Sequence, residues 1–128
     1  MIVIVDYGMG NLSSVLKAVE NFDKDVKISE SVDDLKYANK LILPGVGHFS
    51  KGMEKLKSYD YVNILNKRVL EDRVPILGIC LGMQLFGNYS EEGDSEGLNW
   101  IDFNVLKIRP KNIIRWKVPH MGWNSIKI

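Results

Sequence analysis

The residue best suited to covalent chemistry is Cys80, the single cysteine of the chain, in the segment Gly78-Ile79-Cys80-Leu81-Gly82. Its G-x-nucleophile-x-G spacing is typical of a nucleophile elbow, a sharp turn from a buried strand into a helix. The nucleophile of such an elbow has a strained backbone, and the glycines are needed because a Cβ there would collide with the strand or the helix. Free N–H groups in the first turn of the helix favour the thiolate. We therefore predict a reactive, exposed thiol, although composition alone favours a buried cysteine.

Attack by a thiolate on a carbonyl group produces a negatively charged oxygen, which needs hydrogen-bond donors. One donor is the backbone N–H of Leu81, which directly follows the nucleophile. A second is expected from residues 44–47 (PGVG), because neighbouring parallel strands end at one edge of a sheet and glycine lets N–H groups turn toward a site. We therefore expect Gly45, Val46 and Gly47 to form an oxyanion region with Leu81.

Short apolar runs and amphipathic segments alternate up to Phe86. The apolar runs, rich in β-branched residues, predict buried strands at 2–5, 26–28, 41–43 and 75–79. Helical spacing of apolar residues predicts helices at 12–19, 31–37 and 52–70 and another beginning at Cys80, with Asn11 or Ser13 capping the first. This alternation predicts an α/β fold, a three-layer sandwich with a mostly parallel sheet.

The pattern changes after Phe86. Residues 90–97 are polar and glycine-rich, which predicts a surface loop. The stretches 103–108 and 113–118 are expected to be short strands of a hairpin or an edge sheet.

Length and composition restrict the class of protein. A chain of 128 residues accommodates one hydrophobic core, so we expect a single domain over residues 1–128. With 45% hydrophobic and 26% charged residues and a net charge of +1, the chain matches a globular protein and gives no reason to expect nucleic acid or a membrane as a partner. No signal peptide and no apolar run of roughly 20 residues is recognisable, which favours the cytoplasm.

Five sequence blocks resemble, in order and over nearly the whole chain, those of the glutaminase subunits of imidazole glycerol phosphate synthase in the class-I glutamine amidotransferase family. The blocks are residues 6–12 (DYGMGNL), 43–47 (LPGVG), 78–84 (GICLGMQ), 90–93 (SEEG) and 118–124 (VPHMGWN). The resemblance implies a flavodoxin-like domain that hydrolyses glutamine to glutamate and ammonia. It also implies a heterodimer with a (β/α)8-barrel cyclase, which uses the ammonia to make imidazole glycerol phosphate in histidine biosynthesis.

The resemblance also implies roles for individual residues. Cys80 is the expected nucleophile, and Gln84 and Glu91 are expected to hold the glutamine. Residues expected to face the barrel are Asn11, Pro119, His120, Met121, Trp123 and Asn124. Neither a cofactor nor a metal is expected.

Two departures from the family pattern leave alternatives open. The His-x-Glu pair that completes the family's catalytic triad has no match, because His48 and His120 stand at other positions. We therefore expect the chain to be the N-terminal portion of the domain, with the C-terminal portion missing and little turnover by itself. A non-catalytic scaffold fragment, or a cysteine hydrolase of the same fold with another substrate, remains an alternative.

The second departure is at residues 97–102 (GLNWID), where the histidine enzyme usually has Gly-Leu-Gly. It favours a second alternative, a paralogous subunit that supplies ammonia to a sugar amidotransferase of surface-polysaccharide synthesis.

Overall fold

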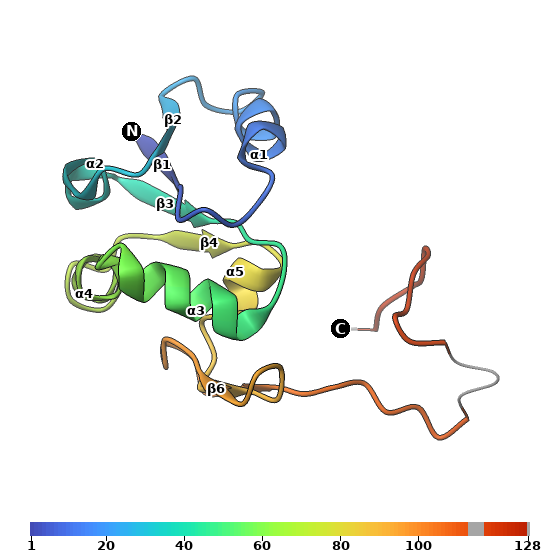
Figure 1. Ribbon diagram of the computed structural model, residues 1–128. Helices are drawn as coiled ribbons and strands as arrows, with labels where there is room; N and C mark the ends of the chain where they lie inside the picture. Colours follow the sequence, from blue (N-terminus) through green and yellow to red (C-terminus); the bar gives the residue numbers. More distant parts are fainter. Residues whose placement is uncertain (113–116, 128) are drawn as a thin grey trace.

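A computed structural model of the chain describes residues 1–112 and 117–127. Its main sheet has four parallel strands in the order β2-β1-β3-β4 (Figure 1). The strands are β1 (Ile2–Val5), β2 (Val26–Ser29), β3 (Lys40–Leu43) and β4 (Ile76–Gly78). The helices are α1 (Leu12–Val19), α2 (Val32–Tyr37), α3 (Phe49–Ser58), α4 (Tyr61–Asn66), the π-helical turn η1 (Lys67–Glu71) and α5 (Leu81–Gln84).

The order of the strands places β1 at the point where the direction of winding reverses. Ile2 is paired with Val26 of β2 on one side and with Lys40 of β3 on the other. After β2 the chain therefore crosses β1 to reach β3. In open α/β sheets, ligands bind in the crevice beyond the carboxyl ends of the strands at such a switch point.

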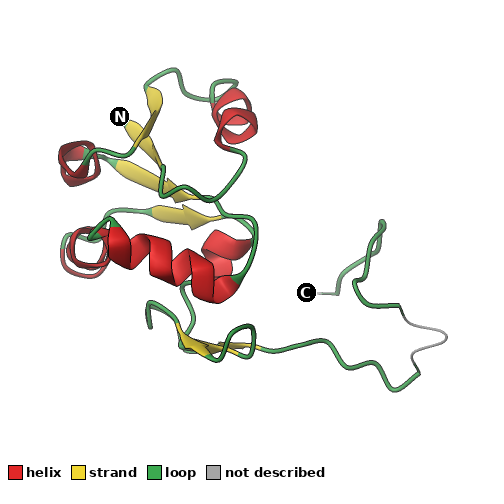
Figure 2. Cartoon of the chain, viewed as in Figure 1, coloured by secondary structure: helices red, strands yellow, loops and turns green. Residues whose placement is uncertain are grey.

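Helices cover both faces of this sheet (Figure 2). Ile2 and Ile4 of β1 pack against α1, whereas Val3 and Val5 point to the opposite face. The cluster on that second face also includes side chains from α2, α3, α4 and α5: Leu35, Phe49, Leu56, Leu65 and Leu81. The three-layer α/β prediction is confirmed.

The helical elements differ from the expected ones in one place. The single helix expected over 52–70 is broken between α3 and α4, where Asp60 adopts a left-handed conformation with φ 55°, and α4 continues directly into the π-helical turn η1. This break turns the chain so that Tyr61 is buried. At the start of α1, the side chain of Asn11 caps the helix by accepting a hydrogen bond from the Ser14 N–H at 3.4 Å.

The prediction of a fully buried strand at 75–79 was wrong. Leu77 of β4 is 57% exposed, because β4 pairs with β3 at the edge of the described sheet and its face toward α1 is uncovered. An apolar hollow of about 430 Å³ lies there, lined by Val15, Val19, Phe22, Ile42, Leu77 and Ile79 among others.

A second, three-stranded sheet follows the α/β body. It has the order β6-β5-β7, with β5 (Tyr89–Ser90), β6 (Ser95–Glu96) and β7 (Asn104–Val105). The expected loop at 90–97 thus contains a hairpin, because β5 and β6 pair across its ends. The strand expected at 103–108 is limited to β7, and most of the strand expected at 113–118 lies outside the described residues. Within the described part of the chain, no helix is both long and apolar enough to span a bilayer.

Candidate active site

β4 leads into α5 at the carboxyl edge of the sheet (Figure 1), and Cys80 lies between these two elements. Its backbone has φ 54° and ψ −115°, and its thiol is exposed. A non-glycine residue in such a conformation stores of the order of 1–3 kcal/mol of strain, which is typical of functional turns. The structure therefore has the strained elbow that the sequence spacing predicts.

The glycines around Cys80 are required by close packing. A Cβ on Gly82 would lie 1.8 Å from the Leu43 carbonyl oxygen, at the end of the neighbouring strand β3. A Cβ on Gly78 would lie 2.5 Å from the Cα of Met83 in α5. The strand and the helix can approach this closely only because both positions lack a side chain.

The loop after β3 contacts the elbow directly. The Leu81 N–H donates a hydrogen bond of 3.3 Å to the Gly45 carbonyl oxygen, so the sheet brings together the two segments expected to form the oxyanion region. In this conformation, the N–H of Leu81 is directed at Gly45 and not at open space. Val46 is 57% exposed at the outer side of the same loop, and Gly47 has a left-handed φ of 113°.

Tyr7 is a residue of this site that the sequence reasoning missed. Its side chain is completely buried, and its hydroxyl donates a hydrogen bond of 2.8 Å to the Pro44 carbonyl oxygen. Burial raises the pKa of Tyr7 far above its usual value, and the nearby Cys80 raises it further. The hydroxyl therefore keeps its proton. The only signal in the sequence was an aromatic residue within the turn that follows the first strand.

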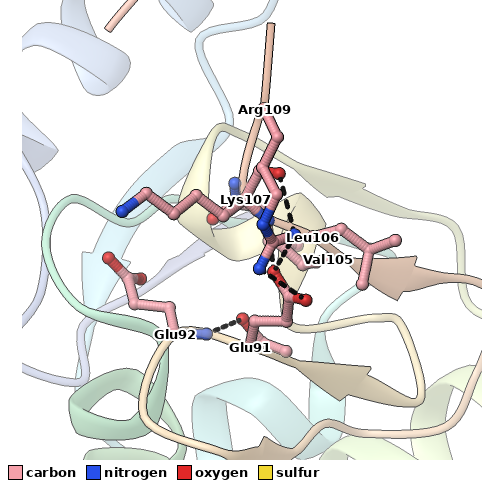
Figure 3. A pocket seen from close by; sticks show the side chains of 8 residues that line it. Glu91, Glu92, Val105, Leu106, Lys107 and Arg109 are labelled. Carbon is pink, nitrogen blue, oxygen red and sulfur yellow. Dashed lines mark hydrogen bonds and ion pairs between the residues drawn. The ribbon is translucent and has the colours of Figure 1, made fainter. Parts of the chain in front are cut away.

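Gln84 and Glu91 line one hollow of about 500 Å³ between α5 and the second sheet (Figure 3). The Glu91 carboxylate accepts hydrogen bonds from the Lys107 N–H at 2.7 Å and from the Arg109 guanidinium at 3.1 Å. The hydrogen bond from the Lys107 N–H, and to a smaller extent that from Arg109, lowers the pKa of Glu91. The carboxylate is therefore ionised at neutral pH. The hollow thus brings together the two side chains expected to hold the amino acid.

The profile of the family described as glutamine amidotransferase class-I matches residues 3–126. The chain belongs to the class-I glutamine amidotransferase family. This finding confirms the resemblance that the five sequence blocks indicated.

Among similar proteins, the amidotransferase chain is 46% identical over 127 residues to imidazole glycerol phosphate synthase subunit HisH 2 of Methanococcus maripaludis, covering 99% of this chain and 62% of the relative. It is 44% identical to subunit HisH 2 of Pseudomonas aeruginosa (98% and 61% covered) and 45% identical to subunit HisH 1 of Campylobacter jejuni (100% and 63%). The chain thus spans about three-fifths of the length of these relatives. A crystal structure of a glutamine amidotransferase shares the fold, with a TM-score of 0.64 at 20% identity over 75% of this chain and 50% of that one.

The two histidines of the amidotransferase chain have local partners. His48 precedes α3, and its Nδ1 lies 3.0 Å from the Ser50 hydroxyl. His120 Nε2 lies 3.1 Å from the side-chain nitrogen of Asn124. Both rings are therefore engaged by residues of their own segments.

The residues expected to face a partner lie in two regions of the amidotransferase. Asn11 belongs to the α/β body, where it caps α1. Residues 119–124 lie on the segment that runs away from the body after β7 (Figure 1). Met121 and Trp123 of this segment are 87% and 104% exposed. Large apolar side chains are therefore displayed where the resemblance implies a protein contact.

Proposed function

We propose that the chain provides the nucleophile and part of the glutamine site of a glutaminase subunit, and that its partner is the cyclase barrel of imidazole glycerol phosphate synthase. The observation that carries the proposal is the exposed thiol of Cys80 on a strained elbow, within a family whose profile matches residues 3–126. The names of the HisH relatives support the choice of partner. In this proposal residues 1–128 belong to one cytoplasmic class-I amidotransferase domain.

The proposed reaction converts glutamine and water to glutamate and ammonia. The thiolate of Cys80 attacks the side-chain amide carbon, forming an S–C bond and an oxyanion. The oxyanion collapses, the C–N bond breaks, and ammonia leaves with a proton supplied by the medium or by a general acid. Water then attacks the thioester, which releases glutamate and restores the thiol.

The charges around the hollow suit a free amino acid. Glutamine carries both an α-ammonium and an α-carboxylate, and the lining has side chains of both signs: Glu91, Glu92, Lys107 and Arg109. We assign the ionised Glu91 to the ammonium group and the amide of Gln84 to a hydrogen bond with the substrate. Because Arg109 already pairs with Glu91, the carboxylate is held in place before glutamine binds.

The proposed oxyanion donors are Leu81 and the Gly45–Val46–Gly47 segment. The oxyanion would compete with the Gly45 carbonyl for the N–H of Leu81. A charged acceptor forms a hydrogen bond roughly twice as strong as a neutral one, so the competition favours the reacting substrate.

The alternative acceptor, a sugar intermediate, was favoured by the departure from Gly-Leu-Gly at residues 97–99. Asn99 stands at the third position with φ 57°, a left-handed conformation that asparagine tolerates better than most residues. The ring of the next residue, Trp100, packs against that of Phe86 with a tilt of 36° and 5.0 Å between the centroids, and its N–H donates a 2.7 Å hydrogen bond to the Asn66 side chain. Backbone conformation and packing thus account for this segment without a different acceptor, and we retain the histidine-pathway assignment.

Alkylation by a chloromethyl-ketone analogue of L-glutamine tests the proposal without requiring a general base. In this reagent a chloromethyl group replaces the amide nitrogen. An S–C bond forms at Cys80, the C–Cl bond breaks, chloride leaves, and the thiol proton goes to solvent. The D-enantiomer is the matched control, because its intrinsic reactivity is identical.

We expect one adduct per chain on Cys80 by peptide mass spectrometry, formed at least about tenfold faster with the L-enantiomer and slowed by free glutamine. Cys80→Ala should give no adduct. Equal rates for the two enantiomers, with no protection by glutamine, would contradict the proposal and favour a scaffold.

A further inference from the structure

A hydrogen bond between Tyr7 and Pro44 joins the loops that follow two neighbouring strands at the switch point of the sheet. Tyr7 follows β1 and Pro44 follows β3, and these strands are neighbours whose carboxyl ends lie at the same edge. The next strand after β3 is β4, which leads into Cys80. A contact between the first two loops therefore lies beside the elbow.

The contact between Tyr7 and the loop is close and buried. The hydroxyl donates to the Pro44 carbonyl at 2.8 Å, and both residues are buried. A Cβ on Gly45 would lie only 2.5 Å from the Tyr7 hydroxyl oxygen, so the phenol fills the space directly against this glycine. A buried carbonyl group without a hydrogen-bond donor raises the free energy of the folded chain. The Tyr7 hydroxyl therefore stabilises this position of the Pro44 carbonyl.

We infer that Tyr7 is a positioning residue of the active site, whose hydroxyl fixes the Pro44 peptide and thereby the Gly45–Val46–Gly47 segment against Cys80. This inference deepens the proposed function and rests on it for its catalytic consequence.

Two successive carbonyl groups of the loop are held by different parts of the protein. The Pro44 carbonyl is bonded to Tyr7 after β1, and the Gly45 carbonyl is bonded to the N–H of Leu81 at the start of α5. If the Leu81 N–H leaves the Gly45 carbonyl to bind the oxyanion, as proposed above, the bond from Tyr7 to the Pro44 carbonyl still holds the loop in position. The Tyr7 hydroxyl is suited to this task because it cannot ionise at working pH.

The test compares Tyr7→Phe with Tyr61→Phe. Tyr61 is a matched control because its side chain is 1% exposed and its hydroxyl also donates to backbone carbonyl groups, those of Asp6 and Glu30. Both variants lose one hydroxyl, but Tyr61 does not contact the loop through it. The measurements are hydrogen exchange of the Leu81 amide, which donates to the Gly45 carbonyl of the loop, and alkylation of Cys80 by two reagents.

Tyr7→Phe should accelerate exchange of the Leu81 amide about tenfold, since the loss of one buried hydrogen bond loosens the loop whose Gly45 carbonyl accepts from this amide. It should slow alkylation by the L-glutamine chloromethyl ketone about tenfold, because the carbonyl of that reagent depends on the positioned donors. Alkylation by iodoacetamide should change less than about twofold, since that reagent reports the thiol alone. Tyr61→Phe should leave all three rates near those of the wild-type chain.

Unchanged exchange in Tyr7→Phe, or equal effects in the two variants, would overturn the inference. If the wild-type chain shows no preference for the L-reagent, the proposed function fails while hydrogen exchange still decides the role of Tyr7. Should Tyr7→Phe not fold, a tyrosine fluorinated beside the hydroxyl serves instead. It is a stronger donor, so exchange of the Leu81 amide should become slower than in the wild-type chain, and an unchanged rate would again overturn the inference.

Discussion

The Phe49 N–H donates a hydrogen bond of 2.8 Å to the Glu92 carboxylate, although the two residues are 43 positions apart. The contact joins the turn between β5 and β6 to the first turn of α3. A carboxylate there satisfies an otherwise free helix N–H and interacts favourably with the helix dipole. This side chain therefore helps to anchor the hollow next to Gln84 to the α/β body, together with apolar packing and hydrogen bonds such as that from Trp100 to Asn66.

Glu92→Ala should lower the free energy of unfolding by about 1 kcal/mol, the usual cost of losing a helix cap. Urea denaturation followed by circular dichroism measures the change. Glu96→Ala is the control, since Glu96 is an exposed residue of the same hairpin. Equal stabilities of the two variants would show that the contact with Phe49 contributes nothing.

The Glu91–Arg109 pair should make stability depend on pH. The pKa of Glu91 is lowered in the folded chain, so its stabilising contribution is complete above the unfolded-state value of about 4.3 and is lost as pH falls through the folded value. Titration of the Glu91 side-chain carbonyl by NMR should show this lowered pKa. Arg109→Ala should raise it only in part, because the larger interaction, with the Lys107 N–H, remains.

Gly82→Ala should prevent stable folding. Its Cβ would lie 1.8 Å from the Leu43 carbonyl oxygen, which belongs to a strand and cannot move aside. Gly52→Ala is the control, because a Cβ there meets only leucine side chains at 3.3 Å. The better helix propensity of alanine, worth about 1 kcal/mol, should offset that crowding. Thermal unfolding of both variants checks the contrast, and a normally folded Gly82→Ala would contradict the packing described for the elbow.

Trp123→Ala should weaken binding to the proposed cyclase barrel by about 2 kcal/mol or more, as expected for an aromatic anchor at an interface. Its stability should not change, since the side chain is fully exposed. Titration calorimetry with the barrel measures the affinity. Phe22→Ala is the control, being an aromatic residue 92% exposed on the body, and an equal loss in both variants would contradict the assignment of Trp123.

Asn99→Gly should be nearly neutral, whereas Asn99→Val should lower stability by about 1–2 kcal/mol, because a β-branched residue is strained at φ 57°. Denaturant unfolding of the two variants separates them. A destabilised Asn99→Gly would show that the asparagine side chain, and not the backbone conformation, determines the choice of residue here.

The sequence predicted those features that depend on local patterns. Apolar runs located the four parallel strands, and glycine spacing located the strained turn at Cys80. The break at Asp60 was missed because the apolar spacing continues across it, and only tertiary packing of Tyr61 selects the left-handed conformation. Tyr7 was missed for a related reason, since its partner Pro44 is 37 positions away and nothing local indicates the contact.

The prediction that Gln84 and Glu91 hold the substrate depended on the family resemblance. Nothing in the local sequence distinguishes Glu91 from an ordinary carboxylate in a surface loop. Its partner Arg109 is 18 positions further along the chain. No periodicity reveals such a pair, so the electrostatic environment of Glu91 required the three-dimensional arrangement.

The uncovered edge of β4 has a consequence for the behaviour of the chain at high concentration. Among the residues that the structure describes, β4 has no strand on its outer edge, and together with the exposed Leu77 this edge is a template on which a strand of another molecule could pair. A strand added there would lie beside β4, which leads into Cys80, so self-association at this edge would restrict access to the thiol. Reactivity per molecule should therefore fall as the protein is concentrated, and dilution should restore it.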